Sequence, residues 1–424
     1  MKNLSQTEKK IHQTIDRKSE EISRTLSQLV RIPTVIGREG RGQKFMERLY
    51  SGLGGKVIVF EADCDKVSKH KAFNDSDYGF KHRPNVLAMV EGDPSARSLI
   101  LNGHMDVVPP DPVEAWEFPP WSGKIMGNRL YGRGAFDMKC GLVANYFALK
   151  SILESGVKPG GTVILESVIE EESQGGGGTL ACCIEGYLAD ATIVTEPTGG
   201  HICIATPGSH WFRVRLVGRP AHAGQAETGI NAISKMNKIY DALVALDRRR
   251  AREIHDPLFE KFASRSCNLN IGRYRAGDWP ATVAGWAELE CRIGNIPAER
   301  TEDVKKEVEE TIGDVVRGDE WLREHPAVVE WFGLQADAWQ QDPNDPLVAQ
   351  LKSCAERVLG QTVELYGIHG AADPRYLEYF ERPAVCFGPS GGNAHSVDEY
   401  VGLDSVIACT KTLASFILEW CGTR

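Results

Sequence analysis

The sequence has no apolar run that approaches the roughly 20 consecutive residues that a membrane span needs. It also shows no signal peptide, because the N-terminal residues M-K-N-L-S-Q-T-E-K-K-I-H-Q lack an apolar core and predict a polar helix instead. We therefore expect a cytoplasmic protein that does not bind a membrane.

Positive charge is in deficit as well. The chain has 49 Lys and Arg against 58 Asp and Glu, a formal net charge of −9, and no basic stripe. A protein that binds nucleic acid needs such a stripe to neutralise phosphates. This balance excludes nucleic acid as a partner.

Cysteine is present, but not in the pattern of a structural metal site. The eleven cysteines form an odd-numbered set without zinc-ribbon spacing, and the vicinal Cys182-Cys183 pair cannot easily provide two ligands to one zinc. A disulfide framework is the alternative. We expect buried, reduced thiols of the kind found in cytosolic enzymes.

The composition that remains is that of a globular protein, with 42% apolar and 25% charged residues. A length of 424 residues exceeds the usual single domain and predicts two. One amphipathic helix is expected over Ser5–Leu29, and strand candidates then alternate with helical stretches. This alternation predicts an α/β domain with a mostly parallel sheet and helices on both faces. The strand candidates are Lys56–Phe60, Asn85–Glu91, Ser98–Asn102, Thr162–Ile169 and Ala191–Thr195, and the helical stretches are Cys140–Glu154 and Gly178–Glu185.

The pattern changes near Pro207 to strand, helix, strand, strand, helix, strand, which predicts a ferredoxin-like α+β domain. In chain order these elements are Trp211–Gly218, Gly229–Arg250, Cys267–Tyr274, Gly285–Ile293, Arg300–Arg317 and Ala327–Phe332. The α/β pattern then resumes with a helix at Pro346–Leu359, a strand at Ala384–Phe387 and a helix at Leu403–Trp420. We predict a catalytic domain of residues 1–207 and 334–424, with residues 208–333 inserted as a smaller domain.

Acid and imidazole groups follow the strand-like runs in a fixed order. They are His104, Asp106, Asp137, Glu171, Glu172, Glu196 and His395. Ligands gather at the carboxyl ends of the strands in open α/β sheets. Taken singly, the His-x-Asp pair could be an ordinary hydrogen-bonded couple, Asp137 a helix N-cap, Glu196 a turn acid and the glutamate run a solvated patch. Taken together, two imidazoles and three carboxylates suit a pair of divalent metals, with one carboxylate left as a base.

These segments resemble the co-catalytic zinc aminoacylase and carboxypeptidase G family, which includes acetylornithine deacetylase and succinyl-diaminopimelate desuccinylase. The resemblance implies that His104, Asp137 and Glu196 hold the first metal, and that Asp137, Glu172 and His395 hold the second, with Asp137 bridging. It implies that Asp106 orients His104, that Glu171 is the general base, and that the Asp137-Met138 peptide is cis.

Oxygen and nitrogen ligands without thiolates fit zinc and tolerate cobalt or manganese. Two such metals can share a hydroxide and polarise a carbonyl, while Glu171 takes a proton and later delivers it to the leaving amine. The expected reaction is hydrolysis of a C–N bond, most simply in an N-acyl amino acid or a related amide.

The inserted domain carries further candidates. His222, in G-R-P-A-H-A-G, is a surface residue by its turn context, but the resemblance makes it a lid histidine that stabilises the oxyanion in a partner subunit's site. This implies a homodimer through the inserted domain and a lid that closes over substrate. Arg292 stands where the family grips a substrate carboxylate, although a structural strand arginine is the alternative, and Arg375 matches a loop near the site.

The chain departs from the family pattern at the substrate pocket. Thr282 stands where the lid asparagine is usual, Glu290 replaces an aspartate, and Trp279 could stack on an aromatic substrate. This run resembles branches of the family that are general deacylases, including a deformylase of aminopyrimidines used in thiamine salvage. A dipeptide, a formylaminopyrimidine or an aromatic amine is therefore the alternative substrate, and a non-catalytic metal-binding dimer is a third hypothesis.

Overall fold

The computed structural model describes residues 4–76 and 78–424. It divides into two compact units: unit 1 comprises residues 1–204, 341–365 and 372–424, and unit 2 comprises residues 205–340 and 366–371. The boundary expected at residue 333 falls inside strand β12 (Val328–Ala336), because that strand pairs with its neighbour again at Gln335 and Ala336 after an irregularity. Residues 366–371 also join unit 2, which the sequence pattern did not predict.

The largest sheet has nine strands in the order β1-β2-β6-β3-β7-β15-β8-β13, with β14 also pairing β8, and most of its residues belong to unit 1. Its central pairs, β6-β3, β3-β7 and β7-β15, are parallel, and the pairs toward both edges are antiparallel. The predicted mixed α/β class with a mostly parallel centre is therefore confirmed. The strands are β1 (Lys56–Phe60), β2 (Asn85–Val90), β3 (Leu99–His104), β6 (Val163–Val168), β7 (Thr192–Val194), β8 (Ile202–Thr206), β13 (Trp339–Gln340), β14 (Leu365–Gly367) and β15 (Ala384–Cys386).

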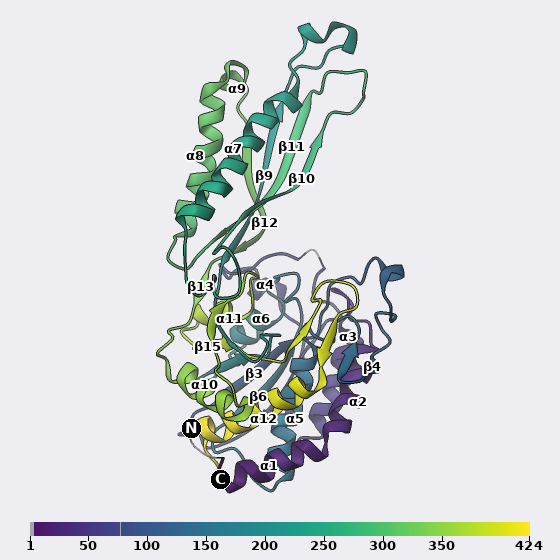
Figure 1. Ribbon diagram of the computed structural model, residues 1–424, viewed down its shortest axis with the longest axis vertical. Helices are drawn as coiled ribbons and strands as arrows, with labels where there is room; N and C mark the ends of the chain where they lie inside the picture. The colour runs from purple at the N-terminus through teal and green to yellow at the C-terminus, as the bar shows by residue number, and fades with distance from the viewer. Residues whose placement is uncertain (1–3, 77) are drawn as a thin grey trace. The chain divides into compact units, whose positions relative to one another are not determined.

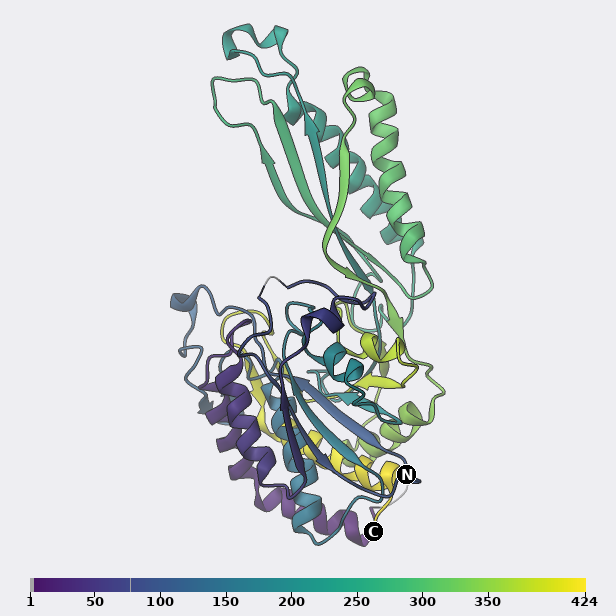
Figure 2. The ribbon, with the colours of Figure 1, turned by 180° about the vertical axis from the view of Figure 1, so that it is seen from behind.

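Helices cover both faces of this sheet. Alternation along β3 turns Gly103 toward Met138 and Leu142 at the start of α5, and turns Asn102 toward Thr179 of α6 on the opposite face. Figure 1 shows α5 and α12 lying side by side, and Figure 2 shows the sheet from the other side. The helices are α1 (Gln6–Arg17), α2 (Ser19–Val30), α3 (Gly40–Ser51), α4 (Cys64–Val67), α5 (Lys139–Glu154), α6 (Thr179–Ile184), α10 (Pro346–Leu359), α11 (Pro374–Glu378) and α12 (Leu403–Cys421), with a short 3-10 turn η1 (Val113–Ala115).

The single N-terminal helix expected over Ser5–Leu29 is two helices. α1 and α2 separate at Lys18, whose ammonium pairs with Glu21 and Glu154. The break lets each half bury its own apolar stripe, since Ile11, Ile15, Ile22 and Leu26 are all fully buried. The apolar residues keep their helical spacing across Lys18, so the sequence pattern did not show the break.

Unit 2 has the predicted ferredoxin-like order of elements. Its four strands lie in the order β10-β11-β9-β12, and the two long helices α7 and α8 pack on one face, as Figures 1 and 2 both show. The core between them includes Phe212, Leu243, Leu289 and Val308. The elements are β9 (Gly208–Val217), the 3-10 segment η2 (Ala223–Thr228), α7 (Ala232–Glu253), β10 (Leu269–Ala276), β11 (Trp286–Asn295), α8 (Thr301–Gly318), α9 (Glu320–Glu324) and β12.

A small antiparallel sheet in unit 1 was not predicted. Its order is β16-β17-β5-β4, formed by Gly391–Gly392, Tyr400–Gly402, Arg129–Tyr131 and Lys124–Met126. Strands of two or three residues are too short to show a period. The sheet matters because β5 leads into the Asp137 loop, and β16 and β17 flank the His395 loop.

None of the eleven cysteines forms a disulfide, and ten of them are buried, in agreement with the expected reduced thiols. Among the described residues, no helix combines the length and the apolar content that crossing a membrane requires.

Candidate metal centre

The predicted metal ligands lie where strands of unit 1 end. His104 is the last residue of β3, Glu172 follows β6, and Glu196 follows β7. The small sheet delivers the other two, because β5 and β17 pair directly and their connected loops carry Asp137 and His395. Strand ends and the small sheet together bring side chains from five separate stretches of chain to one place.

The five side chains form two groups that share Asp137. Ligand-type atoms of His104, Asp137 and Glu196 lie within 4.8 Å of one another, and so do those of Asp137, Glu172 and His395. The Nε2 of His104 is 3.1 Å from Oδ1 of Asp137, and the Nε2 of His395 is 3.3 Å from Oδ2 of the same carboxylate. The structure thus brings together the same two sets that the resemblance implies, with Asp137 between them.

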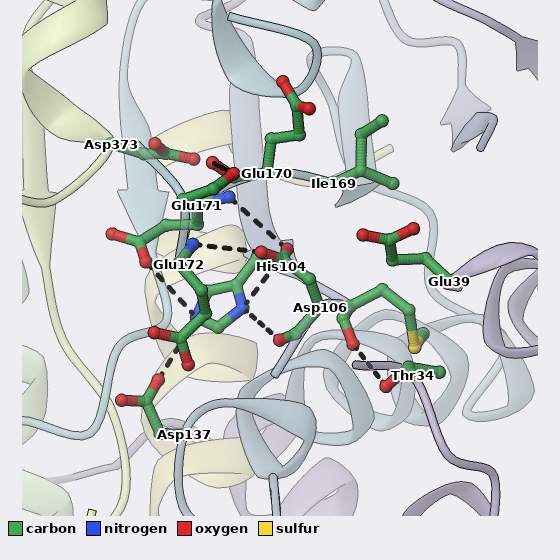
Figure 3. A network of polar contacts seen from close by, with 12 residues as sticks. Thr34, Glu39, His104, Asp106, Asp137, Ile169, Glu170, Glu171, Glu172 and Asp373 are labelled. Carbon is green, nitrogen blue, oxygen red and sulfur yellow. Dashed lines mark hydrogen bonds and ion pairs between the residues drawn. The ribbon is translucent and has the colours of Figure 1, made fainter. Parts of the chain in front are cut away.

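His104 is oriented by the main chain of Asp106. Its Nδ1 is 2.9 Å from the Asp106 carbonyl oxygen, whereas the nearer Asp106 carboxylate oxygen is 3.7 Å away. That carboxylate instead accepts the amide N–H groups of Glu171 at 3.4 Å and Glu172 at 3.0 Å (Figure 3). Asp106 therefore links the strand that carries His104 to the turn that carries Glu171 and Glu172. The sequence had predicted only its contact with His104.

Two residues that the sequence reasoning missed hold the Asp137 loop. The Glu399 carboxylate accepts the amides of Phe136 at 2.9 Å and Asp137 at 3.0 Å, and it pairs with buried Arg133 at 2.5 Å. The Asp137-Met138 peptide is cis, as the resemblance implies. A signal for Glu399 was its position four residues after His395, but nothing in the sequence pairs it with Arg133, 266 positions away.

The charges of the cluster are poorly compensated by the protein alone. Burial raises the pKa of Glu171 and of Glu196 well above the ordinary value, and neighbouring carboxylates raise the pKa of Glu171 further. Hydrogen bonds to Asp137 and Glu172 raise the pKa of His395 to about 10. Burial by itself lowers the pKa of His104, but the surrounding carboxylates outweigh it and hold that pKa well above the usual value.

The donor set fits two divalent cations. One carboxylate oxygen of Glu172 and one of Glu196 are buried without a hydrogen-bond partner among the described residues. Unpaired buried oxygens are costly in a protein, and metal coordination would satisfy them. The three carboxylates and two imidazoles are hard or borderline donors, which suits zinc and similar metals.

Glu171 lies beside the cluster without belonging to either group. Its Oε2 is 3.9 Å from Nε2 of His104, and its Oε1 accepts a hydrogen bond of 3.2 Å from Gln174. Asp373, whose carboxylate accepts the hydroxyl of Thr179 at 2.6 Å, is a further buried acid that raises the pKa of Glu171.

The substrate-binding candidates are distributed over both units. In unit 2, Arg292 donates to Ser209 Oγ, Asn268 Oδ1 and the carbonyl of His369, and no carboxylate among the described residues pairs with it. It lines a cavity of about 540 Å³ on the helix-free face of the sheet, together with Trp211 and Phe332.

Arg375 is in unit 1 and buried. Its guanidinium donates to the hydroxyl of Tyr376 at 2.5 Å, while its Nε has no partner among the described residues. Tyr376 in turn donates to the carbonyl of Gly175, in the loop after the glutamates, at 2.6 Å.

His222, Thr282 and Trp279 meet at the other end of β11 from Arg292. His222 and Thr282 form an isolated β-bridge, and the Thr282 amide donates to the carbonyl of Trp279 at 3.0 Å. His222 is exposed, with its Nδ1 accepting the Gly224 amide at 3.1 Å, and Trp279 is 69% exposed.

Comparisons with known proteins identify a family for this chain. Residues 100–419 match the model of peptidase family M20/M25/M40. The N-formyl-4-amino-5-aminomethyl-2-methylpyrimidine deformylase of Halalkalibacterium halodurans is 31% identical over 435 residues, covering 97% of this chain and 96% of the relative.

Solved structures share the fold. Human carnosine dipeptidase 1 superposes with a TM-score of 0.74 at 19% identity, covering 99% of this chain and 100% of that one. The YXEP protein of Bacillus subtilis, described as a dinuclear metal binding peptidase, has a TM-score of 0.68 at 16% identity, covering 96% of this chain and 100% of that one. The family match over most of the chain and the full-length relative lead to one conclusion: this chain belongs to peptidase family M20/M25/M40 and is a metal-dependent hydrolase that acts on carbon–nitrogen bonds.

Proposed function

We propose that this hydrolase removes a formyl or other small acyl group from an amine attached to a heteroaromatic ring, in the manner of an N-formylaminopyrimidine deformylase. The observation that carries this proposal is the deformylase relative, which matches 97% of the chain at 31% identity. The convergence of both metal-ligand groups beside Glu171 supports the hydrolytic part of the proposal.

The proposed ligand sets are His104, Asp137 and Glu196 for one cation and Asp137, Glu172 and His395 for the other. Two bound divalent cations, for which zinc suits these donors best, would polarise the scissile carbonyl and lower the pKa of the attacking water. Asp106 and Glu399 hold the main chain at this site, because they accept the amides of the ligands Glu172 and Asp137 and of the proposed base Glu171.

Glu171 is the proposed general base and acid. Its carboxylate is buried at the edge of the donor cluster and is not part of either group, so it is free to take a proton from the attacking water and to pass that proton to the leaving amine. Gln174 holds one oxygen of this carboxylate, which leaves the other directed toward His104 at 3.9 Å.

A second candidate substrate is an N-acyl amino acid. It is favoured by Arg292, because this guanidinium has only neutral hydrogen-bond acceptors and its charge is left without a carboxylate partner in the described chain. A substrate carboxylate would supply that partner. A substrate with a ring nitrogen or an amino-substituted ring, and no carboxylate, would not need Arg292.

Steady-state kinetics on both substrate classes tests the proposal. The zinc-loaded protein is assayed with an N-formyl-aminomethylpyrimidine and with N-acetyl and N-formyl amino acids, before and after chelation. We expect kcat/KM at least about tenfold higher for the pyrimidine, no activity after chelation, and recovery with zinc, cobalt or manganese.

The Arg292→Ala variant separates the two candidates. If the pyrimidine is the substrate, the substitution lowers kcat/KM for the amino-acid derivatives far more than for the pyrimidine. A protein that hydrolyses only carboxylate-bearing amides, and loses that activity with Arg292, would show that the second candidate is right. A chain that is inactive on every amide with two zinc ions bound would contradict both.

We also propose a homodimer formed through unit 2. Strand β10 is an edge of its sheet, and edge strands present unpaired main-chain groups that favour pairing with another strand. The exposed apolar side chains Ile233, Tyr240 and Tyr274 lie at this edge, and the two tyrosine rings are 6.3 Å apart. A second copy of the chain would cover them, and the proposed role of His222 is to serve the partner copy's site through its Nε2, which forms no hydrogen bond within the described chain.

We place the protein in the cytoplasm. The absence of disulfides among the eleven cysteines supports a reducing compartment, because thiols stay reduced there.

A further inference from the structure

The glutamate immediately before the proposed base has an unusual backbone conformation. Glu170 lies in the left-handed region with φ of 68°, which costs a residue with a side chain about 1–2 kcal/mol. Figure 3 shows its carboxylate directed away from His104, so this carboxylate does not point toward the metal-ligand groups. Something other than the metals must therefore hold it.

Buried Arg83 supplies that contact. Its Nη1 donates to Oε1 of Glu170 at 2.7 Å, and its Nε and Nη2 form a fork with the two carboxylate oxygens of Glu39 at 2.8 and 2.7 Å. The three side chains are exposed by 2% or less. Ser76 donates to the same Glu170 oxygen at 2.5 Å, and the Gly177 amide donates to the other at 3.0 Å.

The glycine run that follows makes room for this carboxylate. A Cβ on Gly175 would lie 2.2 Å from Oε2 of Glu170, and one on Gly177 would lie 2.9 Å from the same atom. The Gly175 amide also donates to the Glu170 carbonyl at 3.0 Å, which closes the turn around Glu171 and Glu172. The loop is thus shaped to admit Glu170 rather than to contact the metals.

The cluster bears on catalysis through the two residues after Glu170. A left-handed residue reverses the direction of the chain, and Glu171 and Glu172 then present their amides to Asp106. If Glu170 relaxed to an ordinary conformation, the carboxylates of both residues would be displaced together. A displacement of about 1 Å at a reacting group can cost about 100-fold in rate.

We propose that Arg83, Glu39 and Glu170 form a buried ionic cluster that positions the general base Glu171 and the metal ligand Glu172. Arg83 and Glu39 are positioning residues that act through Glu170, and none of the three contacts the donor atoms of the two metal groups. This inference rests on the proposed role of Glu171, which the Glu171→Gln variant tests separately.

Glu170→Gln and Arg83→Lys test the proposal. In Glu170→Gln, the side-chain amide must turn a donor toward either Arg83 or the Gly177 amide, both of which are donors themselves. In Arg83→Lys, the positive charge is kept but the fork to Glu39 is lost. We expect kcat to fall about 10- to 100-fold with KM within about twofold, and the affinity for Zn²⁺, measured by chelator competition, to fall about tenfold.

Arg357→Lys is the matched control. Arg357 bridges Glu8 and Glu419 in the same unit, is 6% exposed, and touches no residue of the site. We expect it to lower the free energy of unfolding in urea as much as Arg83→Lys does, while kcat and Zn²⁺ affinity stay at the wild-type values.

Equal kcat and Zn²⁺ affinity in the wild type and in Glu170→Gln or Arg83→Lys would overturn the proposal, as would equal losses in the Arg357→Lys control. If Glu170→Gln fails to fold, Glu39→Gln with Arg83→Lys carries the same measurement. Full activity in Glu171→Gln would instead show that the base is misassigned and that the proposed function, rather than the positioning cluster, has failed.

Discussion

Units 1 and 2 both carry clusters of arginine and glutamate, and the two clusters lie in opposite environments. In unit 1, Arg83, Glu39 and Glu170 are almost completely buried next to the candidate metal centre. In unit 2, a ladder of ion pairs runs over the helix-free face of the sheet. Glu290 pairs with Arg213 and with Arg273, which is 62% exposed. Arg215 pairs with Glu288 and Glu330.

Arginine–glutamate ion pairs therefore have different energetic effects in the two units. Water competes for the exposed pairs of the ladder, such as Arg215–Glu330 with side chains 56% and 49% exposed, and such a pair contributes about 0–1 kcal/mol. In the buried cluster, removing one partner leaves an uncompensated charge, which is strongly destabilising, so the remaining groups are held to a narrow geometry. Ion pairs position a catalytic group only where water is excluded.

The largest expected effect is on the buried side. Glu171→Gln removes the proton acceptor and keeps the shape, so we expect kcat to fall about 10²- to 10⁴-fold with Zn²⁺ still bound. The matched control is Glu330→Gln in the unit 2 ladder, where Glu330 is 49% exposed and pairs with Arg215 at 3.5 Å.

That control is expected to leave kcat unchanged and to alter the free energy of unfolding by at most about 1 kcal/mol. Steady-state kinetics and urea titration of both variants make the measurement. A comparable loss of kcat in both variants would remove the distinction between the two clusters.

The next effect concerns the assembly of unit 2. Tyr274→Arg places a charge at the centre of the proposed β10 interface in both copies, and like charges brought together cost several kcal/mol. We expect sedimentation velocity to show a dimer for the wild type and a monomer for this variant.

Val328→Arg on β12, the opposite edge of the same sheet, is the control and is expected to stay dimeric, since Val328 is 62% exposed and lies away from β10. A monomeric wild type, or a Val328→Arg variant that dissociates while Tyr274→Arg does not, would contradict the proposed interface.

The smallest expected effect is a pH-dependent one in unit 2. Burial alone would raise the pKa of Asp319, but hydrogen bonds from Lys238 at 2.7 Å and Lys235 at 2.9 Å outweigh it and hold that pKa well below the ordinary value. Since the folded pKa is depressed, the stabilisation is complete above the unfolded value of about 3.9 and is lost as the pH falls through the folded one.

Asp319→Asn should therefore cost about 1–3 kcal/mol at pH 7, and the difference from the wild type should shrink below about pH 4. Hydrogen exchange of the amides in α9 and α7, followed as a function of pH, measures this stability difference. Asp314→Asn, which removes an exposed pair with Arg317, is expected to change little at any pH. A cost for Asp319→Asn that does not change with pH would mean that the side chain caps α9 without contributing charge.

The sequence pattern predicted the long elements well, and for a physical reason. α10 begins and ends at the expected residues, Pro346 and Leu359, because Asp345 caps it, Pro346 stands in its first turn and left-handed Gly360 ends it. The strands that precede Glu172 and Glu196, and the strand that ends at His104, were predicted equally well, since their apolar runs end close to these residues. Elements of two or three residues, such as β16 and β17, are too short to show a periodic pattern and so cannot be predicted from it.

The residues that hold the site were not predicted. Glu399 and Arg133 are separated by 266 positions, and Arg83 and Glu170 by 87. Each of these residues alone is an ordinary charged side chain in the sequence. Only the path of the chain in space pairs them, because their interaction depends on distance and burial rather than on spacing along the chain.

The sequence by itself determined the α/β class, the inserted α+β segment and the types of side chain at the metal centre, since these follow from local periodicity and from the chemistry of the ligands. The tertiary structure decided that Asp137 lies between two groups of donors, that Glu170 turns away to meet Arg83, and that Arg292 and His222 lie at opposite ends of β11. These are contacts between distant segments, and their energies exist only once folding has excluded water from between them.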